Sequence, residues 1–570
     1  MLIALAMAVG SIALTASVQL HNPRILASWH GLLHAAIANQ FPGTLGTPEN
    51  PFFAGHPLPY YWFYHFVTGI LGRVLGLDPL HVFQLITAAG MIVLWIGGGA
   101  IGVRSFGSVQ AGLLIGFLAL AGVNPLGPAI AVGKYVLHGA ELIDASPSTD
   151  SIETVFVSNR EADALMTQPL LGALYVTTDW RRGQNLAWFF DNSSRGLALA
   201  LSLPLLLVFM GALSRRRALM IGVIAAAMTA LNPLIGLALA GSLFGGTVLV
   251  ALRQRLRPGL GGKAETSAML GLSGAALIGT LVAAPTYYHL FLVGGGGAAI
   301  PALSTMLLKA TAVGTGFMIL VPLAIWGCLR TTEVLRDRCW SIVIAAGALL
   351  LVIPVIFLPE GNEHNLANVA QCLLAVPAVA WTATRRVSRW TYMCLVGLFV
   401  PMTLATTASY LGRPSLPISF EGGLLHRPSD DALEHLYRWA RASTPPRAVF
   451  VADPPRPVKM SGNVAELPAF TGRALFVDQP SYLTTPHPDF DRRTALATRL
   501  AEGIPPTPAD AAYLQALERP IYLLSHRADQ SERLSRLTQL YGPPLFHEGF
   551  VAVFDLAAQP TRTVASRPGR

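Results

Sequence analysis

The chain has few charged residues and few cysteines. Asp, Glu, Lys and Arg make up 12% of its 570 residues, whereas hydrophobic residues make up 52%. A soluble globular protein carries about 25% charged residues, so the composition excludes an ordinary soluble protein and predicts an integral membrane protein. The four cysteines lie in or beside apolar runs and form no CxxC pair. That placement excludes a disulfide framework and a cysteine-ligated zinc site.

The charges that are present favour one sign. The net charge is +9, but many basic residues stand in short clusters at the ends of apolar runs, such as Arg215 to Arg217 and Arg385 to Arg389. Clusters of this kind mark the cytoplasmic ends of membrane helices. We therefore predict a membrane partner and no nucleic-acid partner.

No Lys or Arg precedes the first apolar run, Leu2 to Leu20. A cleaved signal peptide normally has a basic start, so we predict a retained membrane helix, with cleavage near Ala16 as the alternative. Eleven runs approach the roughly 20 residues needed to cross a bilayer. They are Leu2–Leu20, Leu80–Val103, Ala111–Val132, Leu197–Leu213, Ala218–Leu231, Leu234–Leu252, Ala268–Ala284, Leu307–Leu329, Trp340–Leu358, Leu366–Ala383 and Trp390–Tyr410.

These runs define a membrane module over residues 1–410, with a tight turn at Asn232-Pro233. Its first loop, residues 21–76, ends in the aromatic stretch Pro57 to Gly76, which we interpret as a juxtamembrane helix. Its second outer loop, residues 138–194, is long enough to be an ordered lid. The positive-inside rule puts the second outer loop and the chain after residue 410 outside. With the aromatic stretch on the surface, the first loop is also outside and the amino terminus is cytoplasmic. If the stretch instead crosses the membrane, the first loop is cytoplasmic.

The composition becomes that of a soluble domain over residues 411–556. Apolar strands such as PRAVFVAD and RPIYLLSH alternate with amphipathic helices such as SDDALEHLYRWARAST, and a hairpin is predicted around Glu548-Gly549. The pattern predicts a three-layer α/β domain outside the cytoplasm, followed by a disordered tail over residues 557–570. The predicted fold class is thus a polytopic α-helical membrane protein with a C-terminal extracytoplasmic α/β domain.

The first loop concentrates histidines. His30 and His34 are four residues apart and so share one helical face, and Glu49 is the only carboxylate between Leu20 and Pro59. One interpretation is that these imidazoles are polar tips at the membrane surface. The other is that His30 or Glu49 acts as a base in a site that also includes His34, His56 and His65. The His30/His34 spacing also suits two ligands of a metal ion, so a metal-dependent hydrolase is a further alternative.

The run GTPENPFFAGHPLPYYWFYH, with the preceding helix, resembles the GT-C superfamily of membrane glycosyltransferases that use polyprenyl-phosphate-linked sugars. In that superfamily an aspartate or glutamate at the start of the first juxtamembrane helix is the base, whereas this chain has Trp29-His30-Gly31 there. The resemblance implies that His30 is the base, oriented by Glu49 or His34. It also implies a set of substrate-binding residues: His34, His56, Tyr60, Tyr61, His65, Lys309, His364 and Asn365.

The implied function is transfer of a sugar from a polyprenyl-phosphate donor to a glycan, lipid or protein acceptor at the bacterial plasma membrane. No cofactor and no metal ligands are assigned, and a divalent cation is possible. The absent acid supports a different class, a non-catalytic relative that binds lipid-linked glycans or assists envelope polymer assembly. A transporter ranks last, because the apolar runs hold almost no charges near their centres.

Overall fold

A computed structural model of the chain divides into two compact units. Unit 1 contains residues 1–26 and 81–415, and unit 2 contains residues 27–80 and 416–570. The structure describes residues 2–21, 29–41, 48–122, 185–190, 194–256, 263–287, 300–301, 303–356, 358, 363–384, 397, 419–421, 424–426, 431–452, 466–478 and 487–556. The long second outer loop, the run Trp390–Tyr410 and the tail over residues 557–570 therefore lie largely or wholly outside the described residues.

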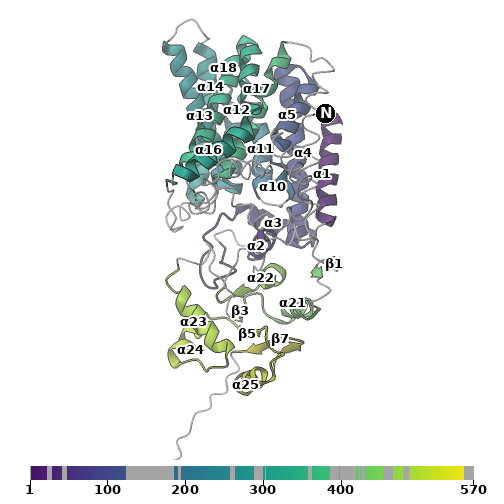
Figure 1. Cartoon of the computed structure of the whole chain (residues 1–570). Coiled ribbons are helices and arrows are strands. Elements are labelled where there is room, and N and C mark those ends of the chain that lie inside the picture. Colours follow the sequence, from purple (N-terminus) through teal and green to yellow (C-terminus); the bar gives the residue numbers. More distant parts are fainter. Residues whose placement is uncertain are drawn as a thin grey trace, which may run out of the picture. The chain divides into compact units, whose positions relative to one another are not determined.

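Unit 1 is a bundle of apolar helices (Figure 1). Its α-helices are α1 (Leu2–His21), α4 (Pro79–Phe106), α5 (Val109–Ala121), α10 (Leu186–Phe190), α11 (Ser194–Phe209), α12 (Arg215–Leu231), α13 (Pro233–Leu256), α14 (Lys263–Ala283), α16 (Leu303–Phe317), α17 (Leu320–Arg330), α18 (Glu333–Val352) and α19 (His364–Ala375). Short 3₁₀ helices follow three of them: η3 (Ala284–Tyr287), η4 (Ile353–Val355) and η6 (Pro377–Ala383).

Six helical segments of the described residues are long and apolar enough to cross a membrane, or seven if the bent pair α16 and α17 is one span. The predicted helical membrane fold is confirmed, and so is the turn at Asn232, which separates α12 from α13. The count of eleven spans stays a prediction, because α5 and α11 are shorter apolar helices and the last predicted span is not among the described residues.

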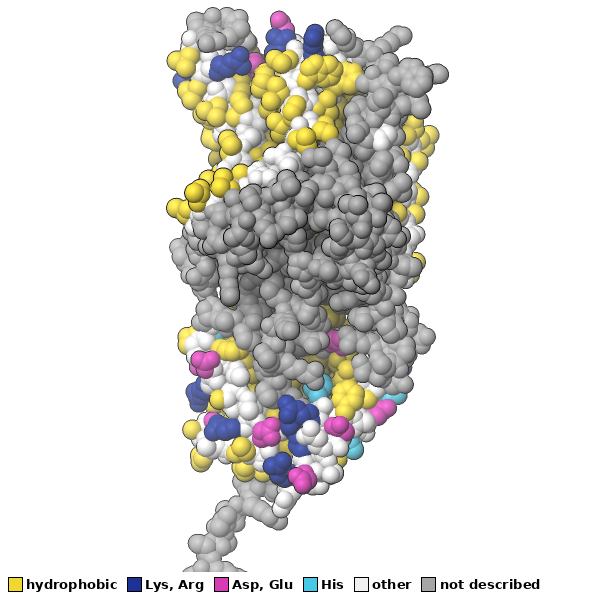
Figure 2. Space-filling model, viewed as in Figure 1, with side chains coloured by type: hydrophobic (Ala, Val, Ile, Leu, Met, Phe, Trp, Pro, Cys, Tyr) yellow, Lys and Arg dark blue, Asp and Glu magenta, His cyan; other side chains and the backbone are white. Residues whose placement is uncertain are grey.

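Among the described residues, arginines lie at the ends of helices, as at Arg215 to Arg217 at the start of α12 and Arg253 and Arg255 in the last turn of α13. Figure 2 shows Lys and Arg side chains at one end of the helical unit, beyond a band of hydrophobic side chains. Arg338, at the start of α18, is buried and donates to the carboxylate of Glu265 and to the carbonyl oxygens of Phe209 and Gly211. One guanidinium thus ties α11, α14 and α18 together at that end.

Small residues let the helices approach closely, as is usual in membranes. A Cβ atom added at Gly279 of α14 would lie 2.0 Å from the carbonyl oxygen of Gly222 in α12. The backbones of these two helices are therefore in direct contact, and Gly279 leaves no room for a side chain.

Unit 2 combines the first loop with the C-terminal domain. The first loop supplies two helices, α2 (Trp29–Ala38) and α3 (Phe63–Leu75). The C-terminal domain supplies the remaining elements: β1 (Ser419–Glu421), β2 (Leu424–His426), α21 (Asp431–Ser443), β3 (Val449–Ala452), α22 (Glu466–Thr471), β4 (Ala474–Leu475), α23 (Phe490–Ala501), α24 (Pro508–Gln515), β5 (Ile521–Ser525), α25 (Ser531–Tyr541), β6 (Phe546–Glu548) and β7 (Val551–Asp555).

Five strands form one mixed sheet in the order β4-β3-β5-β7-β6. Strands β3, β4 and β5 are parallel, and β7 runs antiparallel to both β5 and β6. The pairing of His547 with Ala552 confirms the predicted hairpin. Alternate side chains such as Val449 and Leu523 join a core with α23, α24 and α25, whereas α21 packs against β6 and β7. The predicted α/β domain is confirmed.

The first loop completes this domain. Ala54 N donates to Leu475 O (2.9 Å), Leu475 N to Pro51 O (2.8 Å) and Asp478 N to Phe52 O (3.0 Å), so residues 51–54 extend the sheet beside β4. The buried side chain of Phe53 belongs to the core of the C-terminal domain. Main-chain hydrogen bonds thus join the first loop to the C-terminal domain within unit 2.

Candidate functional site

The two helices of the first loop bring histidines and tyrosines together. His34 of α2 and His65 of α3 are both buried, and their atoms Nδ1 and Nε2 are 2.7 Å apart. The rings of Tyr60 and Tyr64 lie 6.3 and 6.0 Å from the His34 ring. We call His34, Tyr60, Tyr61, Tyr64 and His65 the imidazole–tyrosine cluster.

The two imidazoles share one proton. At 2.7 Å one nitrogen must donate and the other accept, so the pair is stable only when at least one ring is neutral. Burial lowers the pKa of His65 to about 3, partly offset by a backbone hydrogen bond at Tyr61. His65 is therefore neutral at physiological pH, and its ring takes part in the pair through a hydrogen bond rather than through a positive charge.

The tyrosines extend this arrangement. The hydroxyls of Tyr60 and Tyr61 are 2.6 Å apart and their rings are stacked with centroids 4.0 Å apart. Burial raises the pKa of the Tyr64 hydroxyl above its usual value, so it stays protonated. The cluster combines hydroxyls and imidazoles with aromatic rings, a combination that suits a hydroxyl-rich ligand.

Of the predicted residues, the structure thus brings together His34, Tyr60, Tyr61 and His65. His30 lies in the first turn of α2, one turn before His34, and its side chain is outside the described part of the chain. Its role as the base stays a prediction.

Glu49 has other partners. Its Oε1 atom accepts from Arg519 Nη1 and from the Gly55 amide, each at 2.5 Å. The carboxylate thereby joins the first loop to the segment before β5. In this arrangement Glu49 has a clear structural contact, and its catalytic role stays a prediction.

Glu49 also borders a cavity of about 770 Å³ within unit 2. Five arginines and two carboxylates line it: Arg73, Arg441, Arg447, Arg473, Arg519, Glu49 and Asp78. Arg473 is buried and donates to the carbonyl oxygens of Thr471, Arg441 and Thr444, so its charge is fixed in the wall. The excess of positive charge makes the cavity suitable for an anionic ligand.

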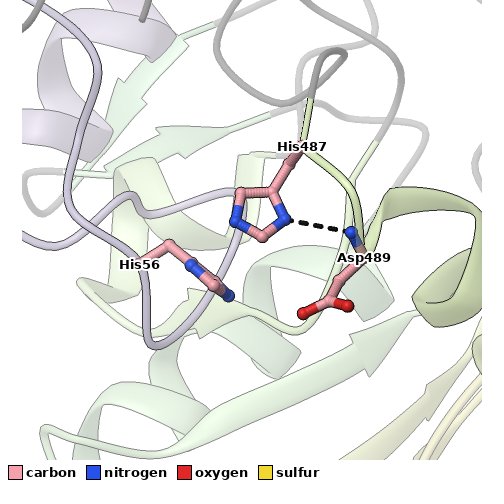
Figure 3. Close-up of side chains that lie close together, drawn as sticks. All are labelled: His56, His487 and Asp489. Atoms are coloured by element: carbon pink, nitrogen blue, oxygen red, sulfur yellow. Dashed lines mark hydrogen bonds between the residues drawn. The ribbon is translucent and has the colours of Figure 1, made fainter.

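His56 belongs to neither the imidazole–tyrosine cluster nor the arginine-lined cavity. Its ring centroid is 4.0 Å from that of His487, and Asp489 stands beside both (Figure 3). His487 lies more than 400 residues away in the sequence, so no local pattern could have paired the two.

Lys309 and Glu363 form a buried ion pair in unit 1. Lys309 Nζ is 2.5 Å from Glu363 Oε1 and donates to Ile356 O at 2.8 Å, and both side chains are at most 1% exposed. Because the pair has no net charge, Lys309 contributes less to anion binding than a single lysine would.

His364, at the start of α19, lies in an aromatic stack. Its ring is parallel to Trp188 of α10 at 4.9 Å, and the guanidinium of Arg195 lies 4.4 Å from the Trp188 ring. Both Arg195 and His364 are buried. Sequence reasoning missed Arg195, although a lone arginine at the start of the apolar helix α11 was a visible signal.

The buried helix α19 has a polar stripe. His364, Asn365, Asn368 and Gln371 are all buried and recur at helical spacing. The Asn368 Nδ2 and Gln371 Oε1 atoms have no hydrogen-bond partner among the described residues. Buried polar groups within a membrane bundle usually mark a binding or transport path.

Comparisons with known proteins give a family match and similarities to solved structures. Residues 9–200 match a family described as an uncharacterized membrane protein (DUF2298). No curated protein matches the chain. Among solved structures the chain is similar to ArnT from Cupriavidus metallidurans in the apo state, with 12% identity, a TM-score of 0.48 and 98% of each chain covered.

The same ArnT bound to undecaprenyl phosphate gives 12% identity, a TM-score of 0.47 and 97% coverage of each chain. The archaeal oligosaccharyltransferase AglB from Archaeoglobus fulgidus, in complex with an inhibitory peptide and a dolichol-phosphate, gives 11% identity and a TM-score of 0.33. That alignment covers 95% of this chain and 71% of AglB.

Proposed function

We propose that the chain is a membrane glycosyltransferase that moves a sugar from a polyprenyl-phosphate donor to an acceptor on the outer face of a bacterial plasma membrane. The observation that carries the proposal is the His34–His65 pair at 2.7 Å, buried among three tyrosines one helical turn beyond His30.

The chemistry needs one base. An acceptor hydroxyl loses its proton as it attacks the anomeric carbon, and the lipid phosphate leaves with the electron pair of the broken bond. We assign the proton to His30, whose unperturbed pKa lies near neutrality. His34 is a positioning residue in this scheme, because its ring is held by His65 and it shares a helical face with His30.

The phosphate needs positive charge and hydrogen-bond donors. We assign these to Arg195, His364 and Asn365 at the end of the polar stripe of α19, with Lys309 contributing through its pair with Glu363. The amides of Asn368 and Gln371 continue the same stripe.

A second candidate is a non-catalytic protein that binds lipid-linked glycans. The contact between Glu49 and Arg519 favours it, because the Glu49 carboxylate already has partners within the protein, Arg519 and the Gly55 amide. The arginine-lined cavity would then bind an anionic glycan.

A transfer assay in membranes separates the two candidates. Membranes that contain the wild-type chain, His30→Ala or His34→Ala are supplied with a panel of radiolabelled polyprenyl-phosphate monosaccharides, and labelled acceptor is measured at matched protein levels. We expect His30→Ala to lower transfer by about 10²-fold or more, as loss of a general base does. The matched control is His547→Ala, which removes an exposed histidine of β6.

Transfer that is undiminished in His30→Ala would remove His30 from the mechanism. Binding of the labelled donors by the wild-type chain without turnover of any of them would favour the non-catalytic candidate.

A further inference from the structure

We propose that His56, His487 and Asp489 form a binding site for a divalent transition-metal ion that clamps the first loop to the C-terminal domain. This site is separate from the imidazole–tyrosine cluster and does not depend on the glycosyl-transfer proposal.

The geometry of the three side chains supports the site. One ligand atom from each residue lies within 4.8 Å of the other two, and Figure 3 shows the three side chains facing a common space. Zinc ligands at about 2.0–2.1 Å from the ion lie roughly 3.3 Å from one another. The side chains are only partly buried, so a shift of about 1 Å by each would close the site.

The ligand atom of His487 can be assigned. Its Nδ1 atom accepts from the amide of Asp489 at 3.2 Å and therefore carries no proton. Ligation through Nδ1 exchanges this long hydrogen bond for a metal bond. Ligation through Nε2 would instead turn an N–H group toward the Asp489 amide, so Nδ1 is the assigned ligand atom.

Neighbouring side chains hold the ligands in place. Tyr513 donates its hydroxyl proton to Asp489 Oδ2 at 3.3 Å, and Arg493 Nε donates to the Tyr513 oxygen at 2.9 Å. The Phe53 ring lies 4.9 Å from His56 and 4.7 Å from His487. Ordered partners of this kind are typical around metal ligands.

The charged groups near His56 act on a bound cation in both directions. The guanidinium of Arg493 opposes a cation near His56, whereas the carboxylates of Asp489 and Glu49 attract one. Two imidazoles and one carboxylate suit zinc or another first-row divalent ion and leave a coordination position for water or a ligand.

A titration of the purified full chain tests the site. After treatment with a chelator, the wild-type chain is titrated with Co²⁺ and then Zn²⁺, and the visible Co²⁺ spectrum and the bound stoichiometry are measured. We expect a four- or five-coordinate Co²⁺ signal that Zn²⁺ displaces and that is lost in His56→Gln, His487→Gln and Asp489→Asn. The matched control His547→Gln, in β6, should keep it. A signal that survives in the three ligand variants would overturn the proposal.

A second measurement needs no variant. Diethyl pyrocarbonate modifies accessible neutral histidines, and mass spectrometry locates the modified rings. Zn²⁺ should lower modification of His56 and His487 at least fivefold and leave His547 unchanged. Equal modification of His56 and His487 with and without Zn²⁺ would overturn the proposal even if a variant failed to fold.

Discussion

Arg493 gives the sharpest test of how the first loop is held. Its side chain is 2% exposed, and Nη1 donates to Ala54 O in the first loop at 2.7 Å and to Phe476 O beside β4 at 2.8 Å. The guanidinium also lies 4.2 Å from the centre of the Phe53 ring. One side chain therefore joins the loop, the sheet and the core.

Replacing Arg493 with Met removes these hydrogen bonds and keeps most of the apolar volume. Each hydrogen bond from a charged donor contributes about 1.5–3 kcal/mol net, so losing the two bonds to carbonyl oxygens should cost roughly 3–6 kcal/mol. With about 1.4 kcal/mol for each factor of ten, local opening becomes at least a hundredfold more frequent.

Hydrogen exchange of the full chain in detergent measures this opening. The reporting amides are those of Ala54, Leu475 and Asp478, which join the loop to the sheet. The matched control is Arg492→Met, because Arg492 is exposed and lies over the Tyr513 ring without entering the core. Exchange at the three amides that changes by less than threefold in Arg493→Met would refute the reasoning, and so would an equal change in both variants.

Two further predictions concern pH and helix packing. The pKa of His65 is about 6.5 in the unfolded chain and about 3 in the folded chain. Above pH 6.5 the imidazole is neutral in both states. Between pH 6.5 and pH 3 it gains a proton only in the unfolded chain. The stability of unit 2 should therefore fall as the pH drops from 6.5 toward 3, by roughly 2 kcal/mol at pH 5. Hydrogen exchange at two pH values measures this change, and the free energy of opening should depend less on pH in His65→Phe than in the wild-type chain. An equal pH dependence in the two chains would contradict this. In unit 1, Gly279→Ala puts a Cβ atom 2.0 Å from Gly222 O and should lower the thermal unfolding temperature, whereas Gly245→Ala, with no atom within 4 Å of the added Cβ, should leave it equal or slightly higher. Equal shifts in the two variants would mean that α12 and α14 are not in backbone contact.

Local features of the fold were predictable from the sequence. The hairpin at Glu548-Gly549 and the turn at Asn232-Pro233 follow from residues adjacent in the chain, whose turn chemistry does not depend on distant partners. Strands β3 and β5 were visible as apolar runs. The insertion of Phe53 into the core of the C-terminal domain was not predictable, because its partners lie about 400 residues further on and an apolar residue in a membrane loop has many possible partners.

Part of the candidate site was predictable from the sequence and part was not. His34, Tyr60, Tyr61 and His65 come together because α2 and α3 are close in sequence and their polar residues share a face. Glu49 and His56, which the sequence grouped with them, instead contact residues of the C-terminal domain.

The extension of the sheet by residues 51–54 means that the first loop is synthesised long before the strand that it binds. The ribosome releases the strand that accepts the loop only after every membrane helix has been synthesised, so during translation the loop must wait without its partner. A fragment that starts after residue 415 would expose the edge of β4 and lack Phe53, and we expect it to aggregate when expressed alone. The edge is completed only when the two halves of the chain meet.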